Sequence, residues 1–235
     1  MKKSIFALCL AVIVTFVTAM ALCIRVLIAP LPVSSFSDGG MRIVLDAGHG
    51  GIDGGVVGKN TGVKESDINL SITLQLKDVL TDMGFDVTLT RKTEAGLYGT
   101  PTKGFKRRDM QQRKEIIENT DPMLVVSIHQ NYYPAQSSRG AQVFYNKDNE
   151  KSERLAKILQ EDLNNLYKSD GAKGRKASAG QYFMLECTPR PSVIVECGFL
   201  SNAADEDMLT SNVGQKRLVE TIAAGVMRYL SDVAT

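Results

Sequence analysis

The sequence predicts a single α/β domain in which a mostly parallel, twisted sheet is flanked by helices and preceded by an N-terminal hydrophobic leader. Short apolar runs rich in valine and isoleucine alternate with longer amphipathic stretches from residue 41 onward. This alternation is typical of strand–helix–strand units. The 235 residues suffice for one sizeable core, and no internal repeat divides them.

The first forty residues have the composition of an export segment. Lys2 and Lys3 precede the uncharged stretch 4–24, which is the order of basic and apolar regions in a signal sequence. The apolar stretch exceeds the roughly 7–15 residues of a cleaved signal and approaches the about 20 of a spanning helix. Residues 1–29 are therefore predicted to be a signal peptide or a signal anchor that tethers the chain to a membrane through residues 4–24. A core helix is the less favoured alternative. Residues 30–40, rich in Pro, Ser and Gly, are predicted to be a linker.

The charge of the exported part argues against one class of function. Without Lys2, Lys3 and Arg25, 25 basic residues remain against 26 acidic ones. A nearly neutral chain gives no electrostatic reason to expect nucleic-acid binding. The basic block 103–114, "KGFKRRDMQQRK", carries apolar residues at helical spacing, so it is interpreted as a solvated helix face.

The four cysteines do not make a disulfide framework in a chain of this length. Cys9 and Cys23 lie in the leader, whereas Cys187 and Cys197 lie near the C-terminal motif. The latter two are expected to be free thiols in the core, and a disulfide between them is the open alternative.

The first half of the domain is predicted to contain two strands with a helix between them. Residues 42–47, "RIVLDA", form a buried strand that ends in a glycine-rich loop. The helix over 65–84 has its apolar residues on one face, with Ser66 as N-cap and Gly84 as its stop. Residues 85–91 form the next strand, and residues 92–104 a loop.

The second half continues the alternation. A polar amphipathic helix over 105–119 is followed by strands over 122–131 and 140–146. A helix over 149–167 and a flexible connection over 169–180 come next. A strand running into a loop is predicted over 192–202, and the last helix carries Leu218, Ile222, Val226 and Tyr229 on one face.

The polar residues at three strand ends predict a shared site. His49 and His129 are the two histidines of the chain, and each follows or closes a β-branched apolar run. Glu196 closes the apolar run "SVIVE" in the same way. Ligands bind beyond the carboxyl ends of parallel strands, so these side chains are expected to converge on one crevice. A structural or merely exposed histidine is the ordinary alternative for each.

The residue types at these positions are those of a catalytic zinc site. Such a site takes three protein ligands and keeps one position open, and two histidines with a glutamate are a known set. Glu65, beside the start of a helix, is the best third ligand, although an exposed acid is the alternative. Glu196 then remains free to act as a base. The loop glycines allow close backbone approach. Asp46 is predicted to support an imidazole, and Asp53 to shape the loop.

Four motifs resemble those of the zinc-dependent N-acetylmuramoyl-L-alanine amidases of the amidase-3 family. They are "IVLDAGHGGIDGGVVG", "KESDINLSITLQLKDVL", "SIHQN" and "VIVECGFLSN", and the resemblance covers nearly all of residues 41–230. It implies that His49, Glu65 and His129 bind one Zn²⁺ per chain and that Glu196 is catalytic. It also implies that residues 41–235 are an amidase domain. Within the family, the short domain with its leader is most similar to the germination-specific amidases of endospore formers.

The resemblance implies a function outside the cytoplasmic membrane. The substrate is peptidoglycan, in which the amide between the lactyl group of N-acetylmuramic acid and L-alanine is hydrolysed, and the role is spore-cortex maturation through muramic-δ-lactam formation. The place is the cell wall or the forespore intermembrane space. Independently of the resemblance, an exported activating or stabilising protein is a partner hypothesis, because a partner could order a site with only three ligands. The alternatives are a vegetative amidase for lysis or cell separation, another peptidoglycan zinc peptidase, and a catalytically dead wall-binding protein.

Overall fold

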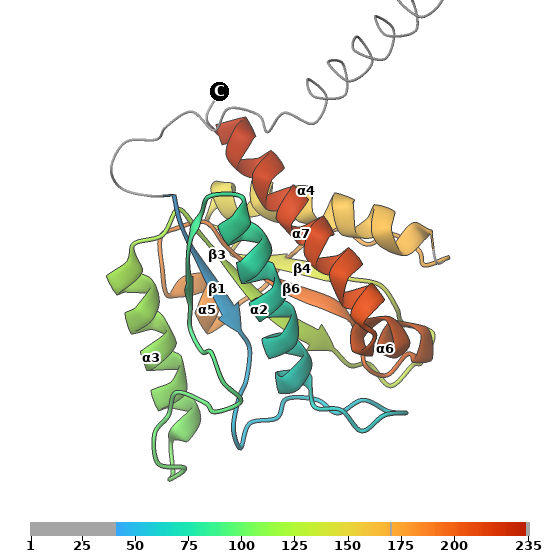
Figure 1. Ribbon diagram of the computed structural model, residues 1–235, viewed down its shortest axis with the longest axis horizontal. Helices are drawn as coiled ribbons and strands as arrows, with labels where there is room; N and C mark the ends of the chain where they lie inside the picture. The colour runs from blue at the N-terminus through green and yellow to red at the C-terminus, as the bar shows by residue number, and fades with distance from the viewer. Residues whose placement is uncertain (1–40, 170, 234–235) are drawn as a thin grey trace, which may run out of the picture. The chain divides into compact units, whose positions relative to one another are not determined.

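The structure, a computed structural model, describes residues 41–169 and 171–233. They form a sheet with helices packed around it (Figure 1). The sheet has six strands in the order β2-β1-β3-β6-β4-β5. Four neighbouring strands are parallel, whereas β4 runs antiparallel to β6 and β5 follows the direction of β4. The prediction of a mostly parallel sheet is therefore confirmed. The strands are β1 (Arg42–Ala47), β2 (Asp86–Leu89), β3 (Leu124–Asn131), β4 (Gln142–Tyr145), β5 (Ser178–Ala179) and β6 (Ser192–Phe199).

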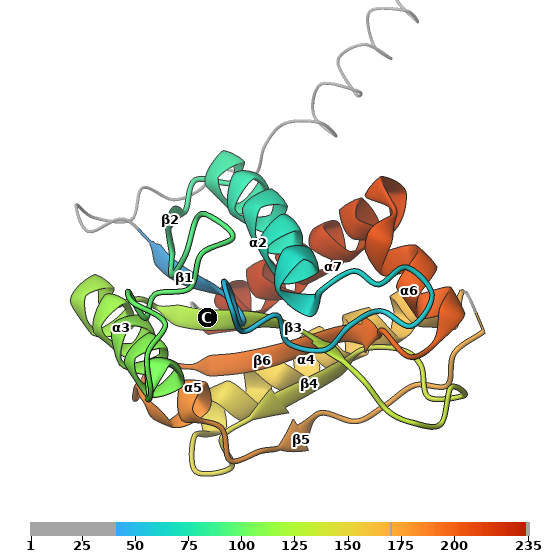
Figure 2. The same cartoon turned by 90° about the horizontal axis from the view of Figure 1, so that it is seen from below.

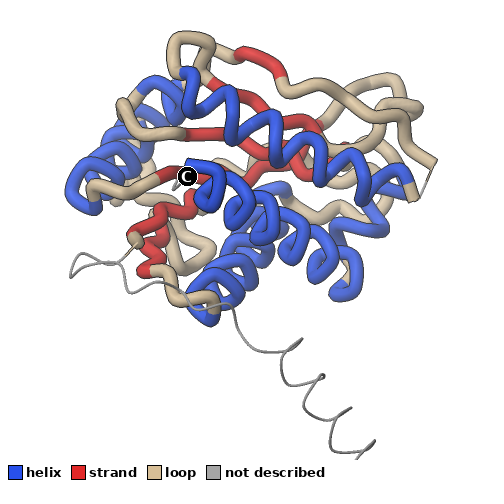
Figure 3. Tube along the Cα trace, turned by 90° about the horizontal axis from the view of Figure 1, so that it is seen from above, coloured by secondary structure: helices blue, strands red, loops and turns tan. Residues whose placement is uncertain are grey.

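Helices cover both faces of the sheet. Helices α2, α4 and α7 pack together on one face, and α3 and α5 lie on the other, as Figures 2 and 3 show. Among the helices of the described ranges, none is both long and apolar enough to cross a membrane. The predicted leader and linker lie outside the described residues. The helices are α2 (Glu65–Asp82), α3 (Phe105–Thr120), α4 (Glu150–Lys168), α5 (Phe183–Glu186), α6 (Ala203–Thr210) and α7 (Asn212–Val233).

The alternation of side chains along the central strands divides the core into two parts. Residues such as Leu45, Val126 and Val195 point into the larger cluster beneath α2, α4 and α7. Their neighbours Val44 and Val125 point into the smaller cluster beneath α3 and α5, because successive strand residues face opposite sides. Toward the carboxyl ends of β1, β3 and β6, the side chains on this second face become polar. These residues are Asp46, Ser127, His129 and Glu196.

The start of α2 differs from the prediction. Ser66 is not the N-cap, because the helix begins at Glu65 after Lys64, and the Ser66 hydroxyl contacts Asp67 instead. The loop backbone satisfies the first amides of the helix: the N–H of Glu65 donates to the carbonyl of Val56 and that of Ser66 to the loop as well. The predicted stop is correct, since the chain leaves the helix through Gly84 at φ +94°.

Three short elements were not predicted. Within the connection 169–180, β5 pairs with the end of β4, and its two residues are too few to show a period. Helix α5 has only four residues, about one turn, which is also too short to show a period. Helix α6 carries a cap that the sequence could have revealed, since the Asn202 side chain accepts from the N–H of Asp205.

The cysteines of the described domain are free thiols, as expected. Cys197 is fully buried in β6, where its carbonyl accepts a hydrogen bond from the Tyr167 hydroxyl. Burial raises the pKa of the Cys187 thiol to about 11, so this thiol is protonated and unreactive near neutral pH.

Candidate active site

Three of the predicted site residues meet at the carboxyl ends of β1 and β3. His49 follows β1, Glu65 opens α2 and His129 lies near the end of β3. Each offers one ligand atom, and these atoms all lie within 4.8 Å of one another. Oε1 of Glu65 lies 3.0 Å from Nδ1 of His129 and 3.3 Å from Nε2 of His49. The group is therefore compact enough to hold one metal ion.

Glu65 is fixed by the backbone around it. Its Oε1 accepts from the N–H of Gln130 at 3.1 Å and from Nδ2 of Asn69 at 3.3 Å, and its Oε2 accepts from the N–H of Val56 at 3.0 Å. Burial alone would raise its pKa, but the two histidines hold the pKa well below the usual range of a carboxyl. Glu65 is thus a buried, ionised carboxylate and not the exposed acid of the alternative reading.

His49 is oriented by Asp53. Nδ1 of His49 lies 3.2 Å from Oδ2 of Asp53, and Nζ of Lys106 lies 3.3 Å from the same oxygen. Burial alone would lower the pKa of His49, but Glu65 and Asp53 together raise it. A carboxylate behind an imidazole fixes the ring and leaves the other nitrogen for a metal. The prediction gave this role to Asp46, which was wrong.

Asp46 instead partners a buried arginine. Nη1 of Arg113 lies 2.5 Å from Oδ1 of Asp46, and its Nε donates to Asp109 at 2.6 Å. The remaining guanidinium N–H groups donate to the carbonyls of Ala47 at 2.8 Å and of His49 at 2.6 Å. Arg113 is fully buried, so the interpretation of this basic block as a solvated helix face is wrong at this position.

A second arginine holds the same stretch from the other side. Arg91 donates to the carbonyls of Ala47 at 2.9 Å and of Gly48 at 3.1 Å. Together with Arg113 it engages three successive carbonyls, ending at His49. His49 has a φ of +62°, and a non-glycine residue in this left-handed region carries a cost of about 1–3 kcal/mol that its surroundings must offset. The two guanidinium groups supply that support.

Two glycines make room for the site, as the glycine-rich loop suggested. A Cβ on Gly48 would lie 2.3 Å from the ring of His129. A Cβ on Gly55, which has a φ of +68°, would lie 2.4 Å from Oε2 of Glu65. Any side chain at either position would displace one of the three clustered residues.

The buried Asp46 carboxylate predicts a pH dependence of stability. Burial alone would raise its pKa, but Arg113 and the hydroxyls of Ser127 and Thr90 lower it to about 2. The unfolded value is about 4, so the stabilisation is complete above pH 4 and is lost as the pH falls from about 4 to about 2. Urea unfolding gives the free energy of unfolding of wild type and of Asp46→Asn. The difference between the two proteins should be larger at pH 7 than at pH 2, by on the order of 2 kcal/mol. A gap independent of pH would contradict this assignment.

Glu196 faces the cluster without belonging to it. It pairs in register with His129 across β3 and β6 and lines the same cavity as His49 and Glu65. Burial raises its pKa to about 7, and nearby Glu65 adds to the rise. Among the described residues its buried Oε2 has no hydrogen-bond partner. A carboxyl that changes protonation near neutral pH and faces a cavity is suited to carrying a proton.

A distant helix anchors the loop that leads into Glu65. The buried carboxylate of Glu206 in α6 accepts from the N–H groups of Asn60 at 3.0 Å and of Thr61 at 2.8 Å, and from the Thr61 hydroxyl at 2.7 Å. The same loop supplies the Val56 N–H that binds Glu65. Sequence reasoning missed Glu206, Arg91 and Arg113.

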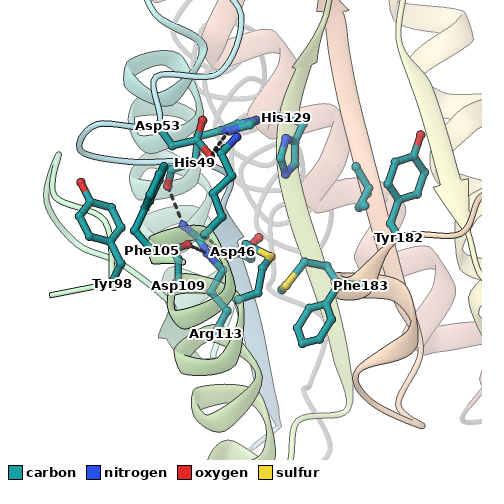
Figure 4. Close-up of a pocket in the computed structure, with 15 residues that line it drawn as sticks. Asp46, His49, Asp53, Tyr98, Phe105, Asp109, Arg113, His129, Tyr182 and Phe183 are labelled. Atoms are coloured by element: carbon teal, nitrogen blue, oxygen red, sulfur yellow. Dashed lines mark hydrogen bonds and ion pairs between the residues drawn. The ribbon is translucent and has the colours of Figure 1, made fainter. Parts of the chain in front are cut away.

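The crevice has two arms that share six lining residues, which are His49, Asp53, Lys106, His129, Tyr182 and Ile194. One arm, hereafter the apolar slot, has a volume of about 250 Å³ and lies between α3 and α5 (Figure 4). The other arm runs past Glu196 to Tyr132. The side chains that wall the apolar slot are Tyr98, Phe105 and Met110 on the α3 side and Tyr182, Phe183, Met184 and Ile194 on the other.

Several known proteins are similar to this chain in sequence and in fold. Residues 43–228 match the model of a family described as N-acetylmuramoyl-L-alanine amidase. The chain is 34% identical, over 82% of its length and 81% of the relative, to the germination-specific N-acetylmuramoyl-L-alanine amidase of Bacillus subtilis. Among solved structures, the CwlD amidase of Clostridioides difficile, in complex with the GerS lipoprotein, is 38% identical with a TM-score of 0.77, covering 81% of this chain and 98% of that one. The catalytic domain of the amidase CwlV from Bacillus (Paenibacillus) polymyxa is 29% identical with a TM-score of 0.68, covering 81% and 98%.

Proposed function

Because the chain belongs to the N-acetylmuramoyl-L-alanine amidase family, we propose that residues 41–235 hydrolyse the amide between the lactyl group of N-acetylmuramic acid and L-alanine in peptidoglycan, with one Zn²⁺ bound by His49, Glu65 and His129. The observation that carries the proposal is the compact group of two imidazoles and one ionised carboxylate. A second acid, Glu196, faces this group, and its buried Oε2 has no hydrogen-bond partner among the described residues.

The donor set fits zinc. Two imidazole nitrogens and one carboxylate oxygen are ligands that catalytic zinc takes, and such a site leaves a position open. When bound, Zn²⁺ lowers the pKa of a water molecule and polarises a carbonyl. Asp53 keeps Nδ1 of His49 engaged, and Gln130 and Asn69 keep Glu65 in place. The protein thus holds the three donors in position before the metal arrives.

Glu196 is the proposed proton carrier. Its burial raises its pKa to about 7, so at neutral pH it is divided between the acid and the base. It takes a proton from the attacking water and returns that proton to the leaving amine of L-alanine. The product is a free lactyl carboxylate on the glycan and a stem peptide that begins with L-alanine.

Replacement of Glu65 tests the ligand that was hardest to identify. Glu65→Gln keeps the shape of the side chain but removes its charge, and its single amide oxygen can accept from only one of the two backbone N–H groups that Glu65 engages. Zinc affinity should therefore fall by more than about 100-fold. Chelator competition measures this directly. Glu94→Gln, the same change at an exposed loop carboxylate, is the matched control and should bind zinc like wild type. Wild-type affinity in Glu65→Gln would remove Glu65 from the ligand set.

We extend the proposal to the spore cortex. The similarity to the germination-specific amidase of Bacillus subtilis supports this role, in which release of stem peptides precedes muramic-δ-lactam formation. The chain would then act outside the cytoplasmic membrane, delivered by a leader over residues 1–29 and a linker over residues 30–40. The neighbouring structure solved with the GerS lipoprotein supports an exported partner protein for this chain as well.

One digestion experiment tests the reaction and its setting. The full chain, purified in detergent and loaded with Zn²⁺, is incubated with purified cortex and with vegetative peptidoglycan. Mass spectrometry should find stem peptides beginning with L-alanine, and more of them from cortex. Cleavage within the stem peptide would instead support a zinc peptidase. Equal release of stem peptides from both walls would support a vegetative amidase. No release from either wall would support a catalytically dead wall-binding protein.

A further inference from the structure

The apolar slot raises the question of which part of the substrate it receives. It opens beside His49 and His129 and extends over the sheet between α3 and α5 (Figure 4). Four aromatic and two methionine side chains and Ile194 supply most of its walls. A polymer that is charged along its peptide and hydroxylated along its glycan offers few groups that such walls would favour.

The position of Glu196 decides which side of the cleaved bond the slot serves. Glu196 lines the arm with Gln130, Asn131 and Tyr132, and it does not line the slot. The residue that returns a proton to the leaving amine must lie on the side of that amine. The stem peptide therefore extends along the arm with Tyr132, and the muramoyl side of the bond faces the slot.

The muramoyl residue carries two methyl groups near the reacting carbonyl. Its lactyl ether is on C3 and its acetamido group is on the adjacent C2, so the two substituents leave the ring side by side. The lactyl methyl is on the carbon bonded to the reacting carbonyl and stays beside the metal group, whereas the acetamido methyl ends a separate substituent that can extend into the slot. With the lactyl carbonyl at the metal group, the acetamido methyl is close to the slot. The glycan chain continues through O1 and O4 and is free to pass over the rim.

The charged residues at the slot are already paired. Asp46 and Asp109 are bound by Arg113, and Asp53 is bound by His49 and Lys106. Asp46 and Asp109 have both oxygens engaged, and at Asp53 an ammonium group of the substrate would have to compete with Lys106. An ammonium group placed against the apolar walls would lose its hydration without gaining a partner.

From this lining we infer that the apolar slot binds the 2-acetamido group of the muramoyl residue and thereby restricts cleavage to N-acetylated muramoyl units. This inference rests on the proposed amidase function. The acetyl methyl contacts Met110 and Phe183, while the amide N–H and carbonyl stay at the rim. Glycans whose muramoyl nitrogen is a free amine are poor substrates.

The first test compares two substrates that differ at C2 alone. Muropeptides with intact N-acetyl groups and the same muropeptides after N-deacetylation are incubated with the zinc-loaded full chain. The expected result is a kcat/KM at least about tenfold lower for the free amine, since a site built for a group loses this much when the group is missing. Equal values overturn the inference while leaving the amidase intact, whereas no hydrolysis of either overturns the proposed function alone.

Binding without catalysis gives an independent readout. N-acetylmuramic acid and muramic acid are each titrated into the metal-free chain, and saturation-transfer NMR follows their protons. The acetyl methyl should receive the strongest saturation, and muramic acid should bind at least about tenfold more weakly. Uniform saturation of both sugars would place the acetyl group outside the slot.

Two variants connect the effect to the slot. Met110→Trp fills it and should reduce kcat/KM for the acetylated substrate by about tenfold or more, whereas Gln111→Trp, the next residue of α3 but exposed and not part of the slot lining, should not. Phe183 is 38% exposed, so Phe183→Glu is expected to fold. It places an unpaired carboxylate in the slot, and the preference should shift toward the free amine. An unchanged ratio in Phe183→Glu would overturn the inference, even if Met110→Trp fails to fold.

Discussion

Glu196→Gln should bind zinc like wild type and lose about 10²–10⁴-fold in kcat. The variant keeps the size of the side chain and its place in β6, but an amide can neither take a proton from water nor return one to an amine. Since Glu196 is not among the three clustered ligand residues, the metal content should not change. Release of stem peptides measures the loss, and metal analysis of the same preparation measures the zinc.

The control for this variant is the same glutamate-to-glutamine change at a position outside the crevice. Glu186→Gln, on the exposed end of α5, makes the same chemical change outside the crevice and should retain full activity. Glu196→Gln with wild-type turnover would exclude Glu196 as the proton carrier. Loss of zinc from it would instead make Glu196 a ligand, although it lies outside the compact group of His49, Glu65 and His129.

Arg113→Met should destabilise the fold by about 3–5 kcal/mol, because it leaves two buried carboxylates without their charge partner. Asp46 and Asp109 would remain beneath α3, and the carbonyl of His49 would lose its 2.6 Å donor. The left-handed turn at His49 would then be less well held, so zinc affinity should fall together with stability. Urea unfolding with and without Zn²⁺ separates the two effects.

Two further substitutions make this result interpretable. Arg107→Met removes an exposed arginine from the same helix and should change stability by no more than about 0.5 kcal/mol. Arg113→Lys keeps the charge but cannot reach both carboxylates and both carbonyls at once, so its stability should lie between wild type and Arg113→Met. Equal stability of Arg113→Met and wild type would show that the buried ion pairs contribute nothing net.

The sequence predicted most of the fold because its strands and long helices are strongly periodic. The apolar runs that end at Ala47, His129 and Glu196 identified the strands and also the edge at which polar groups gather. What the sequence left unpredicted are elements without a period, such as β5 and α5, and the direction of β4 within the mostly parallel sheet. The reversal of β4 depends on pairing with β6, which no local pattern encodes.

The support of the site was less predictable than its centre. His49 and His129 were identifiable because they are rare and close strand ends, whereas Arg113 looked like one basic residue among several in a polar helix. Arg113 is buried because α3 packs on β1. This contact joins segments that are far apart in the sequence, so no local pattern reveals it. The role of supporting an imidazole was predicted for Asp46 but belongs to Asp53. Both are acids near His49 in the sequence, and only the folded loop shows which one reaches the ring.

The attachment of the 58–63 loop to Glu206 has a consequence for biosynthesis. The partners in these hydrogen bonds are 145 and 146 residues apart, and contacts of such separation form late because long segments must first be brought together. A ribosome or a translocase that has released only the first two hundred residues has therefore delivered both histidines but not the anchor of the loop before Glu65. We expect the group of His49, Glu65 and His129 to assemble only when α6 has emerged. A fragment that is truncated before α6 should therefore show no amidase activity.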